Sequence, residues 1–320
     1  MATPGFNTAG QNVASQFGMP LYGMAGFLPF RGNYFWVDEV NGSDGNTGGP
    51  QDPLATLTQA LSLCTANNDD VVFVTGTVHL TATLTWSKAR THMIGLSRGP
   101  YSTSLLTVSN VAATSGAFSP LVNVTAAGCL FQNIYALSGI NQAATQVCWA
   151  EAGGKNNYLD CNFNQVGHAT AAAQAGNRAL TLASTQNYFK GCTIGGDAVI
   201  RATGTNISVE ALDGAGSTTF RECVLPMYTS VAANTFFRTS STALSGYFVF
   251  DGCSFMNDIN TTSGVALTVA ITVATASLST VLLTPSTITA GCTDVAAAGA
   301  VYLSTGAVST TGGNLGLAAT

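Results

Sequence analysis

The sequence predicts an all-β solenoid, in which one short structural unit repeats along the chain. The first observation is a motif of an aromatic residue, two small or polar residues, a cysteine, a variable residue and an apolar residue. Its cysteine-bearing copies contain Cys161, Cys192, Cys223 and Cys253, at intervals of 31, 31 and 30 residues. An earlier copy has Ile134 in the place of the cysteine. A nearly constant period of about 30 residues is typical of solenoids and repeat arrays.

The second observation is the composition of each copy. The copies contain aromatic and β-branched residues with Gly, Asn and Thr, and they lack the i, i+3, i+4, i+7 spacing of a helix. In one straight strand, the aromatic residue and the cysteine would face opposite sides. A two-residue bend at Lys190 and Gly191 would place both inside. The motif thus predicts a core stack of Phe131, Ile134, Tyr158, Cys161, Phe189, Cys192, Phe220, Cys223, Phe250 and Cys253.

The third observation is the low charge. Of the 320 residues, 8% are charged and 46% are hydrophobic, and the net charge is −5; roughly a quarter of the residues are charged in typical soluble domains. The hydrophobic content argues against disorder. A slightly acidic chain without basic clusters argues against nucleic acid and anionic membranes as partners. A weakly charged surface suits a packed assembly.

This repeat resembles the coil of the right-handed, single-stranded parallel β-helices of the pectate-lyase-like superfamily, over roughly residues 34–260. Polysaccharide lyases, hydrolases and bacteriophage spike proteins share that superfamily, so the resemblance implies a fold more than a function. The bend of the family's coil often holds a stacked asparagine. Only the first residue of the matching column is asparagine here, so no continuous asparagine ladder is expected in it. The column consists of Asn133, Asp160, Gly191, Glu222 and Gly252.

Residues 1–33 are expected to form an extended N-terminal docking arm. They lack acidic residues and contain one basic residue, Arg31, and they do not resemble a secretory signal peptide. A strap along the solenoid and an arm that orders against another subunit both fit this composition. The arm is favoured, because so many exposed aromatic residues would be a liability in a free tail. Its docking side chains are predicted to be Phe6, Phe17, Met19, Leu21, Tyr22, Met24, Phe27 and Phe30.

Residues 34–69 read as a strand, a turn-rich loop and a short helix with apolar residues at helical spacing over residues 54–66. This order resembles the N-terminal cap of many pectate-lyase-like β-helices, and a cap covers the open edge of the first coil. Asp38, Asp44 and Asp52 could hold Ca²⁺, but the acidic spacing of an EF-hand is missing and turn chemistry is favoured. Neither a metal nor a cofactor is predicted.

Residues 70–261 are expected to form the β-helix coils. Residues 70–76, 78–86 and 92–96 read as the three strands of a first turn, residues 98–119 as a long loop and residues 199–217 as the least regular section. About eight coils would make a rod on the order of 40 Å long. Residues 262–320 read as terminal coils or a β cap. A membrane span over Val265–Leu283 is disfavoured by its Thr and Ser residues and by the lack of basic flanks.

The eight cysteines are expected to be free thiols. Four of them share an equivalent coil position, which indicates a stack of small apolar side chains. Stacked, in-register side chains do not readily adopt the torsion of a disulfide, near ±90°. The sequence has neither a CxxC pair nor a His/Cys cluster, so a zinc site is not predicted.

Candidate catalytic residues are few, and no catalytic site is predicted. The resemblance implies that an enzyme would present paired carboxylates or a basic residue beside acidic ones. Asp160 with Glu222 would lie roughly 9–10 Å apart, near the upper limit for an inverting pair. Lys190, Arg221 and Asp251 occupy successive coils and are expected to form a weak surface ion ladder. The remaining candidates, which have no evident acid or nucleophile partner, are His79, His92 and His168.

The chain is therefore expected to be a non-catalytic structural protein of a bacteriophage particle. A short rod with an apolar arm favours a capsid decoration or cement protein on the virion surface, assembled in the host cytoplasm. Its expected partners are the major capsid protein or another virion protein, and the resemblance implies a homotrimer. The alternative is a tail spike or another β-helix protein that binds or degrades polysaccharide, with a host glycan as its ligand. An enzyme of this kind would be a polysaccharide lyase or a glycoside hydrolase.

Overall fold

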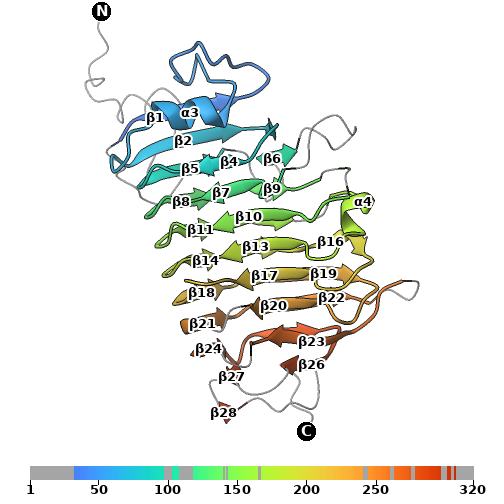
Figure 1. The fold of residues 1–320 in the computed structure, drawn as a ribbon. Coiled ribbons are helices and arrows are strands. Elements are labelled where there is room, and N and C mark those ends of the chain that lie inside the picture. The colour runs from blue at the N-terminus through green and yellow to red at the C-terminus, as the bar shows by residue number, and fades with distance from the viewer. Residues whose placement is uncertain are drawn as a thin grey trace, which may run out of the picture.

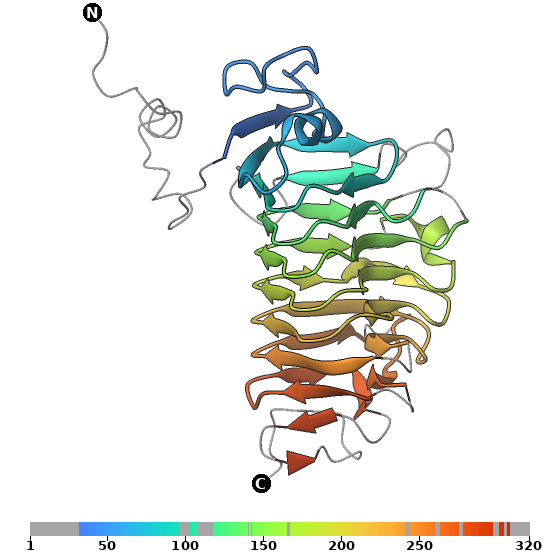
Figure 2. The same cartoon turned by 60° about the vertical axis from the view of Figure 1, so that its left-hand side comes forward.

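The computed structural model describes residues 32–96, 103–107, 118–139, 141, 143–164, 167–240, 244–259, 263–274, 278–296, 301–303 and 306–307. In these ranges the chain is almost entirely β. Three sheets run side by side along the molecule, and all but one of their strand pairings are parallel (Figures 1 and 2). The predicted 1–33 arm, except for Gly32 and Asn33, lies outside the described residues.

The sheets have 11, 8 and 9 strands. The 11-stranded sheet, in order, contains β1 (Tyr34–Asp38), β2 (Asp70–Thr75), β5 (Thr91–Gly95), β8 (Leu130–Gln132), β11 (Asn157–Leu159), β14 (Tyr188–Lys190), β18 (Thr218–Arg221), β21 (Ser245–Asp251), β24 (Leu278–Leu283), β27 (Val301–Leu303) and β28 (Gly306–Ala307). The 8-stranded sheet contains β26 (Cys292–Ala296), β23 (Leu267–Thr272), β20 (Thr235–Thr239), β17 (Ile207–Ala211), β13 (Arg178–Leu182), β10 (Val147–Glu151), β7 (Val122–Val124) and β4 (Leu84–Trp86). The 9-stranded sheet contains β25 (Ile288–Ala290), β22 (Ser254–Asp258), β19 (Val224–Thr229), β15 (Thr193–Ile194), β12 (Asn162–Asn164), β9 (Tyr135–Leu137), β6 (Ser104–Thr107) and β3 (Thr77–Leu80), with β16 (Gly196–Arg201) paired to β19.

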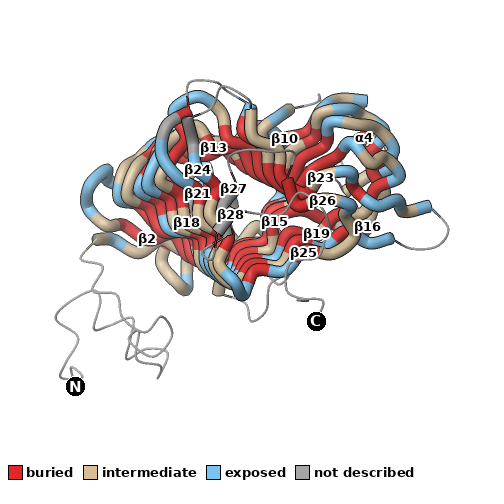
Figure 3. Tube along the Cα trace, turned by 90° about the horizontal axis from the view of Figure 1, so that it is seen from below, coloured by how far each residue is buried: buried red, intermediate tan, exposed pale blue. Residues whose placement is uncertain are grey.

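Each coil supplies one strand to each sheet, and the next coil stacks on it in register. After β11, for example, the chain forms β12 and β13 and then returns to the first sheet as β14, directly beside β11. This wrapping makes a right-handed parallel β-helix, as the repeat predicts. Seen along its axis, the three sheets enclose one interior, and the buried residues line its walls (Figure 3).

Helix α3 (Leu57–Leu63) covers the N-terminal end of the β-helix. It is shorter than the predicted residues 54–66, because Thr56 caps its first turn with a hydrogen bond from the Gln59 amide to its hydroxyl oxygen. Leu57, Ala60 and Leu61 are buried against the first coil. A second, one-turn helix, α4 (Ala169–Ala172), lies in the connection between β12 and β13.

Several predicted boundaries are wrong. Residues 78–86 form two strands, β3 and β4, because the chain turns a corner of the β-helix between Leu80 and Leu84. The expected long loop over residues 98–119 contains β6, which pairs with β3 and β9. The section 199–217, expected to be the least regular, begins in the irregularly paired strand β16 but also contains the regular strand β17, so this prediction holds only for its first residues.

The expectation about asparagine stacking holds for its own column but misses two other corners. Before β11, the Asn156 amide donates to Oδ1 of Asn187 in the next coil at 3.1 Å. Before β13, the amides of Asn177 and Asn206 donate to Oδ1 of the asparagine that follows each in the stack, at 2.8 and 2.9 Å; the stack ends at Asn234. These side chains satisfy backbone donors that the turning chain removes from the sheets.

Candidate functional site

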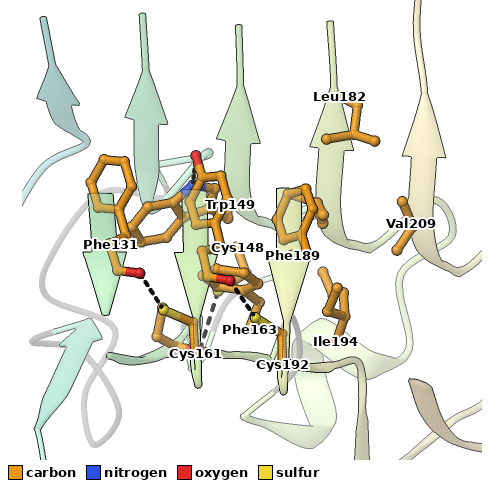
Figure 4. Close-up of a cluster of buried hydrophobic side chains, with 14 of the residues drawn as sticks. Phe131, Cys148, Trp149, Cys161, Phe163, Leu182, Phe189, Cys192, Ile194 and Val209 are labelled. Carbon is orange, nitrogen blue, oxygen red and sulfur yellow. Dashed lines mark hydrogen bonds between the residues drawn. The ribbon is translucent and has the colours of Figure 1, made fainter. Parts of the chain in front are cut away.

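The aromatic residues of the repeat form a continuous stack inside the β-helix. Phe131, Tyr158, Phe189, Phe220 and Phe250 are fully buried, and each ring lies 4.5–5.1 Å from the next, nearly parallel to it. Figure 4 shows the first part of this stack, with a tryptophan of β10 packed against it. The parallel hydrogen-bond ladders set the spacing of the coils, and the ring stack fills the interior at that spacing.

The cysteines of the repeat form a second buried column beside the rings. Each thiol of Cys161, Cys192, Cys223 and Cys253 donates to the carbonyl oxygen of an aromatic residue one coil earlier, over 3.4–3.6 Å. Figure 4 shows the first two of these thiols. Burial raises the pKa of the Cys192 thiol well above its ordinary value. These four thiols are free. Ile134 occupies the corresponding place in the earlier coil and is also buried.

The residues of the bend share a left-handed backbone conformation. Asn133, Asp160, Gly191, Glu222 and Gly252 have φ angles between 53° and 64°. At Gly191 a β-carbon would clash with the carboxylate of Asp160, so the glycine leaves room for that side chain. Asp160 and Glu222 both sit at this bend with one coil between them, and both are exposed.

One outward-facing column crosses the 11-stranded sheet next to this bend. Its members are in register from strand to strand and alternate with the inward-facing rings. From β1 to β21 they are Trp36, Phe73, Ile94, Gln132, Leu159, Lys190, Arg221 and Asp251. The column is apolar over its first coils and charged over its last ones.

The charged end of the column holds weak ion pairs. Nε of Arg221 lies 3.5 Å from a carboxylate oxygen of Glu222 and 3.6 Å from one of Asp251. The three side chains are 39–55% exposed, so these pairs contribute little to stability. The predicted ladder comprised Lys190, Arg221 and Asp251. Among the ion pairs of the described residues, Arg221 pairs with Asp251, and Lys190 takes part in none.

A second outward column runs parallel to the first, two residues earlier on each strand. Over β11 to β21 it contains Asn157, Tyr188, Thr219 and Val249. Asn157 is exposed and the other three are half-buried, while Tyr247, two residues before Val249 on β21, is half exposed. The two columns and Tyr247 together make an outward-facing surface of four coils, which we call the polar face: Asn157, Leu159, Tyr188, Lys190, Thr219, Arg221, Tyr247, Val249 and Asp251, with Asp160 and Glu222 at its edge.

The three histidines have structural partners. His79 Nδ1 lies 3.0 Å from Glu39, which also accepts from the His79 amide. His168 caps helix α4 by accepting from the Thr170 amide. The buried His92 accepts from the Leu130 amide at 3.0 Å, and burial lowers its pKa to about 4, although Asp69 opposes that shift.

The loop carboxylates hold the chain's own backbone. Asp38 accepts from the amides of Val40 and Asn41, and Asp44 accepts from those of Ala55 and Thr56. Asp52 accepts from both the amide and the hydroxyl of Thr47. These contacts are turn chemistry. In the described part of the chain, no cluster of three or more His, Cys, Asp or Glu side chains could hold a metal ion.

Sequence reasoning missed several buried ionic groups, among them Glu210 and Glu151. Glu210 lies between Arg178 and Arg238 of the neighbouring coils; burial alone would raise its pKa, but hydrogen bonds from both guanidinium groups bring the pKa below its ordinary value. Glu151 lies in the inward-facing column of β10 and accepts hydrogen bonds from the Tyr158 hydroxyl and from the amides of Gly153 and Gly154. The sequence signal for both groups is a single glutamate within an otherwise apolar strand: Glu210 in β17 and Glu151 in β10.

Comparisons with known proteins give the same fold. Searches against models of protein families and against curated proteins find no match. Among solved structures, pectin methylesterase from Aspergillus niger matches with a TM-score of 0.52 and 16% identity, over 87% of this chain and 84% of that one. Pectin methylesterase PemA from Erwinia chrysanthemi matches with a TM-score of 0.54 and 10% identity, over 84% and 80%. Pectate lyase Pel9A matches with a TM-score of 0.55 and 13% identity, over 79% and 62%.

The chain folds as a right-handed parallel β-helix similar to those of pectin methylesterase and pectate lyase. At 10–16% identity this likeness concerns the fold alone. Such a β-helix turns one side of every coil to the solvent in the same place, so that neighbouring coils build continuous outer faces. No helix in the described ranges has the length and apolar character needed to span a membrane.

Proposed function

We propose that this β-helix binds a polysaccharide along the polar face of the 11-stranded sheet. The observation that carries the proposal is the continuity of that face: four coils in register present amide, hydroxyl, aromatic and charged groups to solvent. Such groups donate to and accept from sugar hydroxyls. An aromatic ring such as Tyr188 supplies an apolar surface with a polar tip. An extended polymer matches a row of equivalent positions along the rod.

The solved structures that share the fold support this choice of ligand. Pectin methylesterase and pectate lyase are named for pectin and its acid form, which are polymers rather than small molecules. The virion, capsid and homotrimer readings have no counterpart among these structures. The likeness is one of fold, so the ligand class requires a direct binding measurement.

Binding without cleavage is the form that the geometry favours. Asp160 and Glu222 sit two coils apart, which corresponds to roughly 9–10 Å, whereas paired carboxylates in glycosidases lie about 5–9.5 Å apart. Arg221 lies between two carboxylates at 3.5 and 3.6 Å and is half exposed, so its guanidinium N–H groups can donate to a ligand. These residues fit the role of ligands to a glycan better than the roles of an acid and a base.

The test is a binding measurement on the full-length protein with pectin, polygalacturonate and a neutral glucan, by affinity electrophoresis and calorimetry. We expect binding to at least one polymer, with a several-fold loss of affinity in Tyr188→Ala and Arg221→Ala. Thr85→Ala is the matched control, because Thr85 is exposed on a different sheet. Unchanged affinity in both variants, or no binding to any polymer, would reject the proposal. Release of new reducing ends would show that the protein cleaves its ligand.

A second candidate is a structural role in a virus particle, as the low charge favours. A separate observation supports it: exposed apolar side chains gather on the outer side of the last coils of the 9-stranded sheet. They include Val224, Met256, Ile259 and Ile288, which are 38–48% exposed. Groups of exposed apolar residues mark interaction surfaces. Co-sedimentation with undecorated phage capsids and with isolated tails tests this role, and Met256→Lys should abolish a capsid interaction that depends on this surface.

A further inference from the structure

The outer side of the first coils carries a small hydrophobic cluster that is separate from the core. Its members come from β1, β2 and β5 and from the residue after β5: Tyr34, Trp36, Val71, Phe73, Ile94 and Leu96. The rings of Tyr34 and Trp36 lie 6.0 and 5.0 Å from that of Phe73. Between these residues, Val37, Val72 and Val74 point inward and belong to the main core. The cluster therefore covers the outside of the sheet.

This outer cluster interrupts the pattern of the sheet. Later coils place exposed polar residues in the same two columns, such as Asn157, Lys190 and Arg221, whereas Val71 is fully buried and Phe73 is 7% exposed. A strand with solvent on one side alternates apolar and polar residues. β2 is instead apolar on both sides, and its outer residues lie under the half-buried Tyr34, Trp36 and Leu96, which leave an apolar surface for a further segment to cover.

The chain that leads into β1 is placed to cover it. Asn33 donates to Asp70 at 2.6 Å, and the Val71 amide donates to Asn33 at 2.8 Å. Gly32 lies so close to the backbone of Asn68, Asp69 and Asp70 that a β-carbon would clash with it. The connection to the preceding 31 residues is thus pinned at the start of β2, beside the cluster.

Those 31 residues have the composition of a covering segment. They contain one charged residue, Arg31, and, besides Met1, nine large apolar ones: Phe6, Phe17, Met19, Leu21, Tyr22, Met24, Phe27, Leu28 and Phe30. Three of the nine lie within five residues of Gly32, and the cluster begins two residues after it. A few extended residues, at about 3.3 Å each, are enough to cross the neighbouring strands.

We propose that residues 1–31 dock on the outer cluster of their own chain. The segment would bury its apolar side chains against Trp36 and Phe73 and close the outside of the first coils as α3 closes their end. The proposal assigns the predicted docking residues to an internal surface. It does not depend on the function of the polar face.

Tryptophan fluorescence tests the docking in the full-length protein. Of the three tryptophans, Trp86 and Trp149 are fully buried in the core, so quenching by acrylamide reports on the half-buried Trp36. The test variant carries Phe27→Ser, Leu28→Ser and Phe30→Ser. The control carries Asn7→Ser, Gln11→Ser and Asn12→Ser in the same segment. We expect several-fold faster quenching in the test variant and unchanged quenching in the control.

Equal quenching in the wild-type protein and both variants would overturn the proposal. Protection of Trp36 that disappears on dilution would overturn it too, since it would assign the cluster to the segment of a second copy. Far-UV circular dichroism shows whether the variants keep the β-helix. Trypsin cleavage after Arg31 offers a measurement without substitutions. The next basic residue along the chain is Lys88, so a cut at Arg31 releases residues 1–31 as one segment. The proposal predicts that the released segment stays with the β-helix in gel filtration.

Discussion

The inner and outer columns of the 11-stranded sheet differ sharply, although their residues are neighbours in the sequence. Inside, Phe131, Tyr158, Phe189, Phe220 and Phe250 repeat one aromatic ring in coil after coil. The outer residue that follows each ring is different in every coil: Gln132, Leu159, Lys190, Arg221 and Asp251. The inner column is uniform because each ring must pack on the next. The outer column is constrained only by solvent and by whatever binds there.

The difference separates the origin of the fold from the origin of function. Uniform inner residues pack on one another in every coil and favour one register, and this periodicity is visible in the sequence. Varied outer residues are free to acquire a ligand. Substitutions in adjacent positions should therefore have opposite effects, large on stability inside and large on binding outside.

The largest expected loss of stability comes from the middle of the ring stack. Phe189 lies between Tyr158 and Phe220, with ring centroids 4.5 and 4.9 Å away, and it is fully buried. Phe189→Ala should lower the free energy of unfolding by about 3–5 kcal/mol, because it leaves a cavity between two coils. Urea unfolding measures this loss. Lys190→Ala, one residue further along, should change the same free energy by less than about 0.5 kcal/mol; a similar loss in both variants would remove the distinction between the columns.

The second effect concerns His92. It faces outward from the 11-stranded sheet but is buried, unlike the exposed residues in the outer columns of later coils. Its pKa in the folded protein is about 4, below the ordinary 6.5, because burial disfavours the imidazolium and Nδ1 accepts from the Leu130 amide. A base with a lowered pKa stabilises the fold fully above pH 6.5, and this contribution is lost as the pH falls to about 4. The full loss is roughly 3 kcal/mol, since each tenfold change in proton affinity is worth about 1.4 kcal/mol.

Urea unfolding between pH 7 and pH 4 measures this dependence. His92→Gln keeps an acceptor for the Leu130 amide and should flatten the decrease in that range. His79→Gln is the control, because His79 is exposed beside Glu39, and its curve should follow that of the wild-type protein. A decrease that is identical in all three proteins would assign the pH dependence to other groups.

The third effect tests the cysteine column. The Cys192 thiol is 1% exposed and donates to the Tyr158 carbonyl oxygen at 3.4 Å. Cys192→Ser should lower the free energy of unfolding by about 1–3 kcal/mol, because a hydroxyl is costlier to bury than a thiol. Thermal and urea unfolding both report it. Cys292→Ser, at a half-buried position, should have a smaller effect, and the reverse order would contradict the role of the column in the core.

The sequence allowed the interior to be predicted, because the aromatic and cysteine residues recur with the period of the coil. The bend lies one residue later than predicted, because Lys190 still belongs to β14 and Gly191 and Cys192 connect it to β15. The asparagine stacks at Asn156 and Asn177 were not predicted, because the partner of each asparagine lies about 30 residues away and no local sequence pattern marks it. The polar face was not predicted for a different reason. Its residues share no residue type, and only the register of the strands brings them into one row.

The smallest effect on stability should accompany the largest effect on binding. Arg221 is half exposed and its ion pairs with Glu222 and Asp251 are long, so Arg221→Ala should change the free energy of unfolding by less than about 0.5 kcal/mol. The same substitution removes a cation with five N–H donors from the centre of the polar face. Unfolding in urea and binding of polysaccharide, measured on one preparation, separate the two roles. If Arg221→Ala destabilised the protein as much as Phe189→Ala does, the outer column would have a structural role, and the proposal that the polar face binds a ligand would be rejected.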